Sequence, residues 1–171
     1  MDLSFADRFA EHERDKREAK QLELNRPQTK FPADKRLEDF DYRHQTTITK
    51  CQVNALLDLP FLDNRENRVF IGPPAVGKTH LTIEISQKAI EVGYNVRFKN
   101  ALEQVEELEI VEMRGELKKK LTQLVKFDAL IIDELGYLPM SRRARYASFH
   151  LVNRFYEYRT LTITTIKDFI H

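Results

Sequence analysis

Apolar residues are spaced differently in successive parts of the chain, and the spacing predicts alternating strands and helices. Short apolar runs with the length of strands occur at four places: Arg68–Ile71, Asn95–Phe98, Phe127–Ile132 and Leu161–Thr165. After the first run, helix-forming residues continue from Lys78 to about Val92. Strands that alternate with helices predict an α/β fold, in which helices cover both faces of a mainly parallel sheet.

Capping residues indicate where several helices begin. Thr49 followed three residues later by Gln52 has the form of a capping box and opens a short helix. Asn100 and Ser141 are suited to the N-cap positions of two later helices. In the helix after Ser141, four large residues share one face: Tyr146, Phe149, Val152 and Tyr156.

The beginning of the chain differs in composition from the rest. From Asp2 to about Leu24 there is no Pro or Gly, and charged helix-forming residues dominate. Because acidic and basic residues are nearly balanced there, the segment is typical of a solvated helix rather than a basic clamp. We therefore expect a helical N-terminal region and linker over residues 1–45, and the main domain over residues 46–171.

The overall charge gives no indication of a polyanionic partner. The 28 Lys and Arg against 27 Asp and Glu leave a formal net charge of +1, so a nucleic-acid surface would have to be local. The single Cys51 cannot form an internal disulfide, which favours a reducing compartment. No apolar run approaches the roughly 20 residues that span a bilayer, and we expect a cytoplasmic protein without a membrane segment.

A glycine-rich segment between the first predicted strand and the first long helix matches the phosphate-loop pattern G-x-x-x-x-G-K-[ST]. It reads Gly72-Pro73-Pro74-Ala75-Val76-Gly77-Lys78-Thr79, followed by His80. Backbone amides of such a loop and the positive end of the next helix can surround a phosphate. Lys78 would reach the β- and γ-phosphate oxygens and Thr79 would ligate Mg²⁺. We predict that residues 72–80 bind a nucleoside triphosphate, ATP, with magnesium.

An acidic pair follows the third predicted strand. Asp133 stands where a carboxylate can hold hydrated Mg²⁺, and Glu134 can orient and deprotonate a water molecule for attack on the γ-phosphate. Lys78 and Glu134 are therefore the candidate catalytic residues, and Thr79 and Asp133 the candidate metal ligands. Without the phosphate loop, an acidic pair at a strand end would more simply be a solvated cap.

The spacing of these motifs also predicts a strand order. One strand separates the loop strand from the Asp133 strand in sequence, as in P-loop ATPases with a glutamate after the magnesium-site aspartate. In that class the next strand lies between the two. We expect Leu161–Thr165 in this position, with Thr164 and Thr165 near the γ-phosphate.

Several longer segments are narrower signals than the loop alone: Leu59-Pro60-Phe61-Leu62, Asn67, Phe70-Ile71-Gly72-Pro73-Pro74, Val76-Gly77-Lys78-Thr79-His80-Leu81, Gly93-Tyr94-Asn95-Val96-Arg97-Phe98 and Leu130-Ile131-Ile132-Asp133-Glu134-Leu135-Gly136-Tyr137-Leu138-Pro139. Together they resemble the IstB family, DnaC-like AAA+ ATPases that help insertion-sequence transposases. The resemblance covers roughly residues 30 to 169. It implies a three-layer P-loop NTPase core of the AAA+ type after a helical N-terminal region.

The resemblance further implies an ATP-dependent helper that assembles on duplex DNA, helps to select the insertion target and stimulates its transposase. Family members use ATP between neighbouring subunits, which implies a homo-oligomer that depends on ATP and DNA. Two basic clusters are candidates for phosphate contacts, Lys118-Lys119-Lys120 and Arg142-Arg143 with Arg145. Either cluster can equally be a solvated helix surface.

Three departures from the family pattern affect the expected chemistry. Ala75 replaces a usual Gly, a mild change if φ is negative there and a costly one if it is positive. Thr165-Ile166 stands where the family has Ser-Asn, and Ile166 cannot hydrogen-bond through its side chain to a γ-phosphate. The resemblance also implies a fifth strand, intersubunit arginines and a helical lid, none of which is expected before His171.

Other functions remain open at this level. A DnaC-like helicase loader in DNA replication would share the same core. A catalytically impaired remnant would bind nucleotide without turnover, as the loss of the asparagine suggests. A small-molecule kinase fits less well, because Glu134 follows Asp133 and no basic lid is evident.

Overall fold

The computed structural model describes residues 31, 48–136 and 138–166. Apart from Phe31, the predicted helical N-terminal region and linker lie outside these residues, as does Tyr137. Phe31 packs against the core, with its ring 5.7 Å from that of Phe98 in an edge-to-face arrangement.

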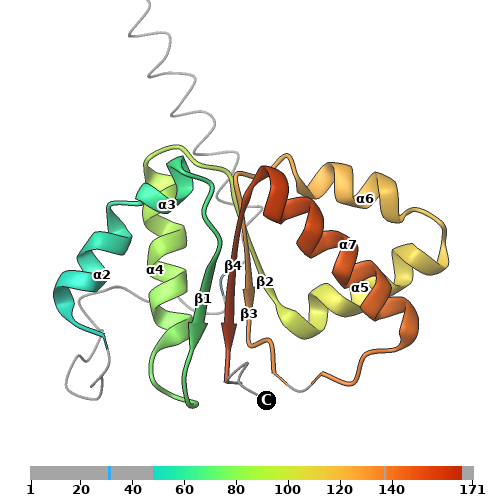
Figure 1. Cartoon of the computed structure of the whole chain (residues 1–171), viewed down its shortest axis with the longest axis horizontal. Coiled ribbons are helices and arrows are strands. Elements are labelled where there is room, and N and C mark those ends of the chain that lie inside the picture. The colour runs from blue at the N-terminus through green and yellow to red at the C-terminus, as the bar shows by residue number, and fades with distance from the viewer. Residues whose placement is uncertain (1–30, 32–47, 137, 167–171) are drawn as a thin grey trace, which may run out of the picture.

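Four parallel strands form the centre of the fold. They are β1 (Arg68–Ile71), β2 (Val96–Asn100), β3 (Ala129–Asp133) and β4 (Thr160–Thr165), arranged in the order β1-β4-β3-β2. The prediction that the last strand lies between the loop strand and the Asp133 strand is confirmed. In Figure 1 the arrowheads of β1 and β4 point to the same edge of the sheet, and that edge carries the functional motifs.

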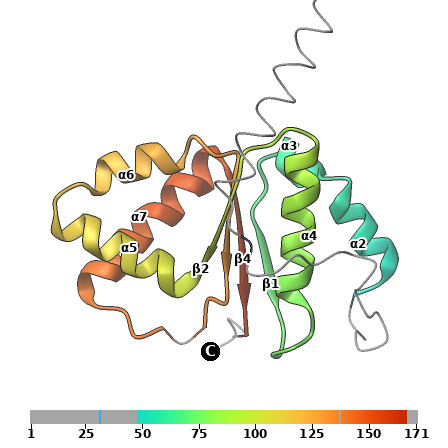
Figure 2. The ribbon, with the colours of Figure 1, turned by 180° about the vertical axis from the view of Figure 1, so that it is seen from behind.

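Helices cover both faces of this sheet, which confirms the predicted α/β class (Figures 1 and 2). One face is covered by α2 (Lys50–Leu57), α3 (Pro60–Asp63) and α4 (Lys78–Glu91). The other is covered by α5 (Ala101–Met113), α6 (Leu117–Leu124) and α7 (Arg142–Tyr158). No helix in the described part of the chain is both long and apolar enough to cross a membrane.

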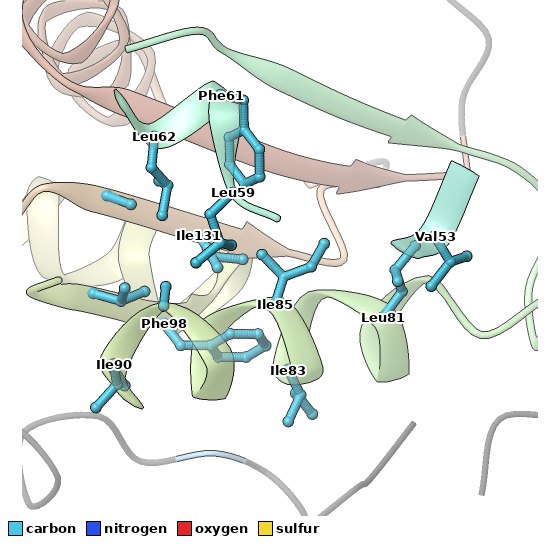
Figure 3. Close-up of a cluster of buried hydrophobic side chains, with 13 residues drawn as sticks. Val53, Leu59, Phe61, Leu62, Leu81, Ile83, Ile85, Ile90, Phe98 and Ile131 are labelled. Atoms are coloured by element: carbon cyan, nitrogen blue, oxygen red, sulfur yellow. The ribbon is translucent and has the colours of Figure 1, made fainter. Parts of the chain in front are cut away.

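Each face of the sheet has its own hydrophobic cluster. Figure 3 shows the first, in which Leu81 of α4 lies beside Val53 of α2, and Ile85 of α4 lies near Ile131 of β3. The second cluster joins Leu130 of β3 to side chains of α5, α6 and α7. All five residues of β3 are buried, as expected for a parallel strand covered on both faces.

The capping residues predicted the first residues of the helices more accurately than the apolar runs predicted the ends of the strands. Thr49 and Gln52 form the predicted capping box, and Asn100 and Ser141 cap α5 and α7 through their side chains. The third strand begins two residues later than predicted, because the Phe127 amide donates to the Leu124 carbonyl in the turn after α6.

The four large residues predicted to share a face of α7 do so, but this face is exposed. The exposed fractions are 53% for Tyr146, 62% for Phe149, 38% for Val152 and 71% for Tyr156. The buried face of α7 packs on the rest of the protein with two alanines and two larger apolar residues: Ala144, Ala147, Leu151 and Phe155. The small alanine side chains allow α7 to approach α5 and the sheet closely. The size of its apolar side chains therefore did not indicate which face of α7 is buried.

Substitutions on the two faces of α7 should therefore differ in their effect on stability. Phe155→Ala should lower the free energy of unfolding by about 3–5 kcal/mol, because a fully buried ring leaves a cavity. Phe149→Ala, on the exposed face, should change it by less than about 0.5 kcal/mol. Urea unfolding of both variants measures the difference, and equal losses would contradict the assignment of the faces.

Candidate functional site

The predicted phosphate loop connects β1 to α4 at the carboxyl edge of the sheet. Gly77 occupies the N-cap position of α4 with φ of 84°, a left-handed conformation that favours glycine. A Cβ atom at Gly72 would lie 3.4 Å from Val76 Cγ2, so the loop is closely folded on itself. The loop therefore has the compact shape predicted from its glycines.

Ala75 has a positive φ of 62°. Of the two outcomes expected for this departure from the family pattern, the structure shows the costly one. A left-handed conformation brings the Cβ of an L-residue too close to the following carbonyl oxygen. The loop thus holds a strained residue where glycine would be unstrained.

The Lys78 side chain folds back over this loop. Its Nζ atom donates to the carbonyl oxygens of Gly72 and Pro73, each at 2.7 Å. Burial lowers the pKa of Lys78 from its ordinary value, and the negative charges of Asp133 and Glu134 oppose this shift. The ammonium group thus lies within the concave side of the loop, close to the acidic pair.

Asp133 lies at the end of β3 and is buried. Its Oδ1 atom accepts hydrogen bonds from Thr79 Oγ1 at 3.2 Å and from Thr164 Oγ1 at 2.6 Å. The two predicted metal ligands, 54 residues apart in sequence, are therefore neighbours.

A hydroxyl and a carboxylate oxygen are hard donors of the kind that Mg²⁺ prefers. Among the residues that the structure describes, no group of three or more His, Cys, Asp or Glu is arranged to hold a metal ion. This donor set fits Mg²⁺, which usually takes one or two protein ligands and completes its shell with water and substrate phosphates. Thr79 and Asp133 are the residues that would hold it.

Glu134 follows Asp133 in a left-handed conformation, with φ of 62°. Its Oε2 atom accepts a hydrogen bond from Asn100 Nδ2 at 3.1 Å. The sequence interpretation assigned Asn100 only as a cap of α5, which it also is, through Leu102 N at 2.9 Å. The signal for its second contact is the register of the sheet, which pairs Asn100 with Asp133.

A cavity of about 610 Å³ lies between the loop and the ends of β3 and β4. It brings together most of the predicted site residues and is lined by Pro74, Ala75, Gly77, Lys78, Thr79, His80, Glu134, Gly136, Thr164, Thr165 and Ile166. Ile166, which the sequence interpretation placed where the family has an asparagine, is 49% exposed. Polar side chains of the loop and Glu134 line the cavity, whereas the buried Asp133 lies behind Thr79 and Thr164, and Ile166 adds an apolar side chain.

A second hollow of about 890 Å³ lies on the other side of the loop. It shares Gly77 and Lys78 with the first cavity and also contains the remaining loop residues Gly72, Pro73 and Val76. Its other walls come from α2 and β1, with apolar side chains that include Leu56 and Phe70. The two hollows thus adjoin each other at Gly77 and Lys78 of the loop.

The two basic clusters lie away from this site. Lys118 and Lys119 are exposed on α6, whereas Lys120 forms an ion pair with Glu107 of α5. Arg142, Arg143 and Arg145 are exposed in the first turn of α7. In the described part of the chain neither cluster lines the cavity beside the loop.

Comparison with known sequences decides the family. The sequence profile described as IstB-like ATP binding protein matches residues 2–171. The chain belongs to the IstB-like family. This confirms the resemblance that its motifs indicated.

Two relatives illustrate the range of the IstB-like family. One, the "Insertion sequence IS5376 putative ATP-binding protein" of Geobacillus stearothermophilus, is 36% identical over 96% of the chain and 66% of the relative. The other, the "Insertion sequence IS21 putative ATP-binding protein" of Pseudomonas aeruginosa, is 37% identical over 86% of the chain and 56% of the relative. The alignments thus span about half to two thirds of these relatives' lengths.

Solved structures with the same fold include replication proteins. DnaI matches with a TM-score of 0.62 at 18% identity, covering 78% of the chain and 73% of DnaI. The DnaC helicase loader matches with a TM-score of 0.57 at 21% identity, covering 78% of the chain and 80% of the loader. At such low identity these matches establish a shared fold alone.

Ala75→Gly should stabilise this IstB-like chain. Relief of the left-handed conformation should contribute roughly 1–2 kcal/mol, and the greater freedom of unfolded glycine should offset about 0.4–1 kcal/mol of it. A net gain of about 0.5–1 kcal/mol in the free energy of unfolding is expected.

The matched control is Ala55→Gly in α2, which should lower stability by about 0.5–1 kcal/mol because glycine loses more conformational freedom than alanine when it folds into a helix. Urea unfolding measures both changes. A loss of stability in both variants would mean that Ala75 is not left-handed in solution.

Proposed function

We propose that this IstB-like chain binds ATP with Mg²⁺ and hydrolyses it, as a cytoplasmic helper ATPase of an insertion-sequence transposase. The observation that carries the proposal is the contact of the phosphate loop with the acidic pair: Thr79 Oγ1 lies 3.2 Å from Asp133 Oδ1, and Thr79 and Glu134 line one cavity. Membership of the IstB-like family supports the transposition context.

Residues 72–80 bind the triphosphate in this proposal. The loop amides and the N-terminal end of α4 attract phosphate oxygens, because unpaired N–H groups and the helix dipole both favour a negative charge. Lys78 exchanges its two carbonyl partners for β- and γ-phosphate oxygens. Pro73, Pro74, Ala75, Val76 and His80 complete the walls around the nucleotide.

The base of the nucleotide is accommodated by the apolar hollow on the other side of the loop. Nucleotide sites combine an apolar wall for the base with a few polar groups for the phosphates. The hollow adjoins Gly77 and Lys78, and its walls include Ile48, Leu56 and Phe70. Its position beside the loop supports binding of a whole nucleotide rather than of a phosphate alone.

Thr79 and Asp133 would hold Mg²⁺ where their oxygen atoms meet beside the cavity. When bound, the metal neutralises charge on the phosphate oxygens as the γ-phosphate is transferred to water. Glu134 acts as the base that orients the attacking water and accepts its proton. Asn100 orients the Glu134 carboxylate through its hydrogen bond to Oε2.

Duplex DNA, a transposase and further copies of the chain are the proposed partners. Relatives of the family are named as insertion-sequence proteins, which supports a transposase partner. The exposed arginines at the start of α7 and the lysines of α6 are the proposed DNA contacts. In this proposal residues 46–171 form the ATPase core, residues 1–45 a helical region and linker that precede it, and ATP and DNA drive oligomer formation.

A second candidate is a nucleotide-binding protein without turnover. Ile166 supports it, because an apolar side chain lines the cavity where a hydrogen-bonding asparagine is usual in the family. A helicase loader is supported less well, since the likeness to the DnaC helicase loader concerns the fold.

Substitutions in the cavity should separate ATP binding from ATP hydrolysis. Lys78→Ala should weaken ATP binding at least about tenfold, because it removes a charged contact with the phosphates. Glu134→Gln should leave ATP binding nearly unchanged and lower hydrolysis about 10²–10⁴-fold, because the base is lost. Lys88→Ala, an exposed position on the same helix as Lys78, is the matched control.

Fluorescent ATP-analogue titration and phosphate release, each with and without duplex DNA, are the measurements. Turnover that disappears in Glu134→Gln while binding persists supports the ATPase. Binding without turnover in the parent chain would favour the second candidate, and no binding would contradict both.

The proposed DNA-binding arginines predict a change in salt dependence. Replacing Arg142, Arg143 and Arg145 by Ala should make the slope of log K against log salt shallower by about 0.9 for each DNA phosphate that is no longer neutralised, up to about 2.7. DNA-binding titrations across salt concentrations measure the slope. The pair Arg114→Ala and Lys88→Ala controls for general charge, and an unchanged slope in the α7 variant would exclude this cluster.

A further inference from the structure

Thr164 makes two side-chain hydrogen bonds that the sequence analysis did not predict. It lies near the end of β4, between β1 and β3, and its side chain is buried. Its Oγ1 atom lies 2.6 Å from Asp133 Oδ1 and 2.8 Å from the backbone nitrogen of Glu134. One hydroxyl therefore contacts both residues of the acidic pair.

The directions of these two hydrogen bonds follow from their chemistry. A backbone amide can only donate, so the Glu134 N–H donates to Thr164 Oγ1. The hydroxyl has one proton, and an ionised Asp133 carboxylate can only accept it. Thr164 thus accepts from one acidic residue and donates to the other, and both hydrogen bonds depend on the same oxygen atom.

The same residue also holds the backbone where β3 ends. The Leu135 amide donates to the Thr164 carbonyl oxygen at 2.8 Å, next to the bond from the Glu134 amide. Between these two amides the chain passes through Glu134, whose φ of 62° is unfavourable for a residue with a side chain. The hydrogen bonds of the Glu134 and Leu135 amides to Thr164 hold the backbone in this conformation.

We propose that Thr164 is the positioning residue that couples the magnesium-binding carboxylate to the catalytic carboxylate. Its hydroxyl orients Asp133 Oδ1 toward Thr79 and fixes the peptide from which the Glu134 side chain projects. The proposal rests on the proposed ATPase function for its catalytic consequence. Thr164 acts through Asp133 and Glu134, and its hydroxyl is already engaged by both.

This assignment connects four elements of the fold. Hydrogen bonds run from Thr79 of α4 to Asp133 of β3, to Thr164 of β4, to the Glu134 backbone, and from the Glu134 side chain to Asn100 of β2. Loss of the Thr164 hydroxyl should therefore disturb the metal site while leaving the phosphate loop intact. Outer partners of metal ligands typically contribute about 10–100-fold to metal affinity or activity.

Two variants of Thr164 and one control test the proposal. Thr164→Val removes the hydroxyl and keeps the shape, whereas Thr164→Ser keeps the hydroxyl. Thr162→Val is the control, since Thr162 is equally buried two residues earlier on β4, and no described hydrogen bond joins its side chain to the acidic pair. Thermal unfolding of each variant verifies that it is folded before any other comparison.

The first measurement is ATP affinity with Mg²⁺ and with EDTA. In the parent chain, Mg²⁺ should raise the affinity for ATP, and we expect Thr164→Val to reduce this gain about tenfold. In EDTA, the affinity of Thr164→Val for ATP should stay within about twofold of that of the parent chain. Thr164→Ser and Thr162→Val should match the parent chain under both conditions. Equal loss of affinity with and without Mg²⁺, or no loss at all, would overturn the proposal.

The second measurement needs no nucleotide. Amide hydrogen exchange of Thr164→Val should be at least about tenfold faster at Glu134, which loses its acceptor, and unchanged at Leu135, whose acceptor is a backbone carbonyl. If the parent chain binds no ATP, the proposed function fails, and this exchange pattern still decides whether Thr164 holds the acidic pair. Unchanged exchange at Glu134 would overturn that role.

Discussion

The parallel pairing of β4 between β1 and β3 is the constraint on which the rest of the site depends. It places the carboxyl ends of three strands side by side, so that distant parts of the sequence meet at one edge. The Thr165 carbonyl accepts from the Gly72 amide at 3.2 Å, which attaches the start of the phosphate loop to β4. From the preceding residue of the same strand, the Thr164 hydroxyl reaches Asp133. Without this pairing, the loop and the acidic pair would have no reason to lie together.

The same edge carries backbone strain. Ala75 and Glu134 both have φ of 62°, and each left-handed residue with a side chain costs on the order of 1–3 kcal/mol. Such residues persist only where the surrounding structure requires them. At Glu134 the requirement is visible in the hydrogen bonds of two successive amides to Thr164. At Ala75 it comes from the close folding of the loop between Gly72 and Gly77.

The family and the fold carry different information about this chain. The IstB-like profile matches along nearly the whole sequence, whereas DnaI and the DnaC helicase loader share the architecture at 18% and 21% identity. Because one fold supports many functions, the likeness to these two structures shows the shared architecture but not what the chain acts on. The context of insertion-sequence transposition rests on the family.

The sequence by itself determined the α/β class, the phosphate loop, the acidic pair, the helix caps and the family. These features depend on residues close together in the chain, where spacing, backbone sterics and local hydrogen bonds are sufficient. The tertiary structure alone decided which face of α7 packs, the sign of φ at Ala75, and the contacts of Asn100 and Thr164 with the acidic pair. Each of these depends on the space left by neighbouring elements or on pairing between residues distant in the chain, 31 positions apart for Thr164 and Asp133. Composition and periodicity along one segment carry no information about such long-range contacts.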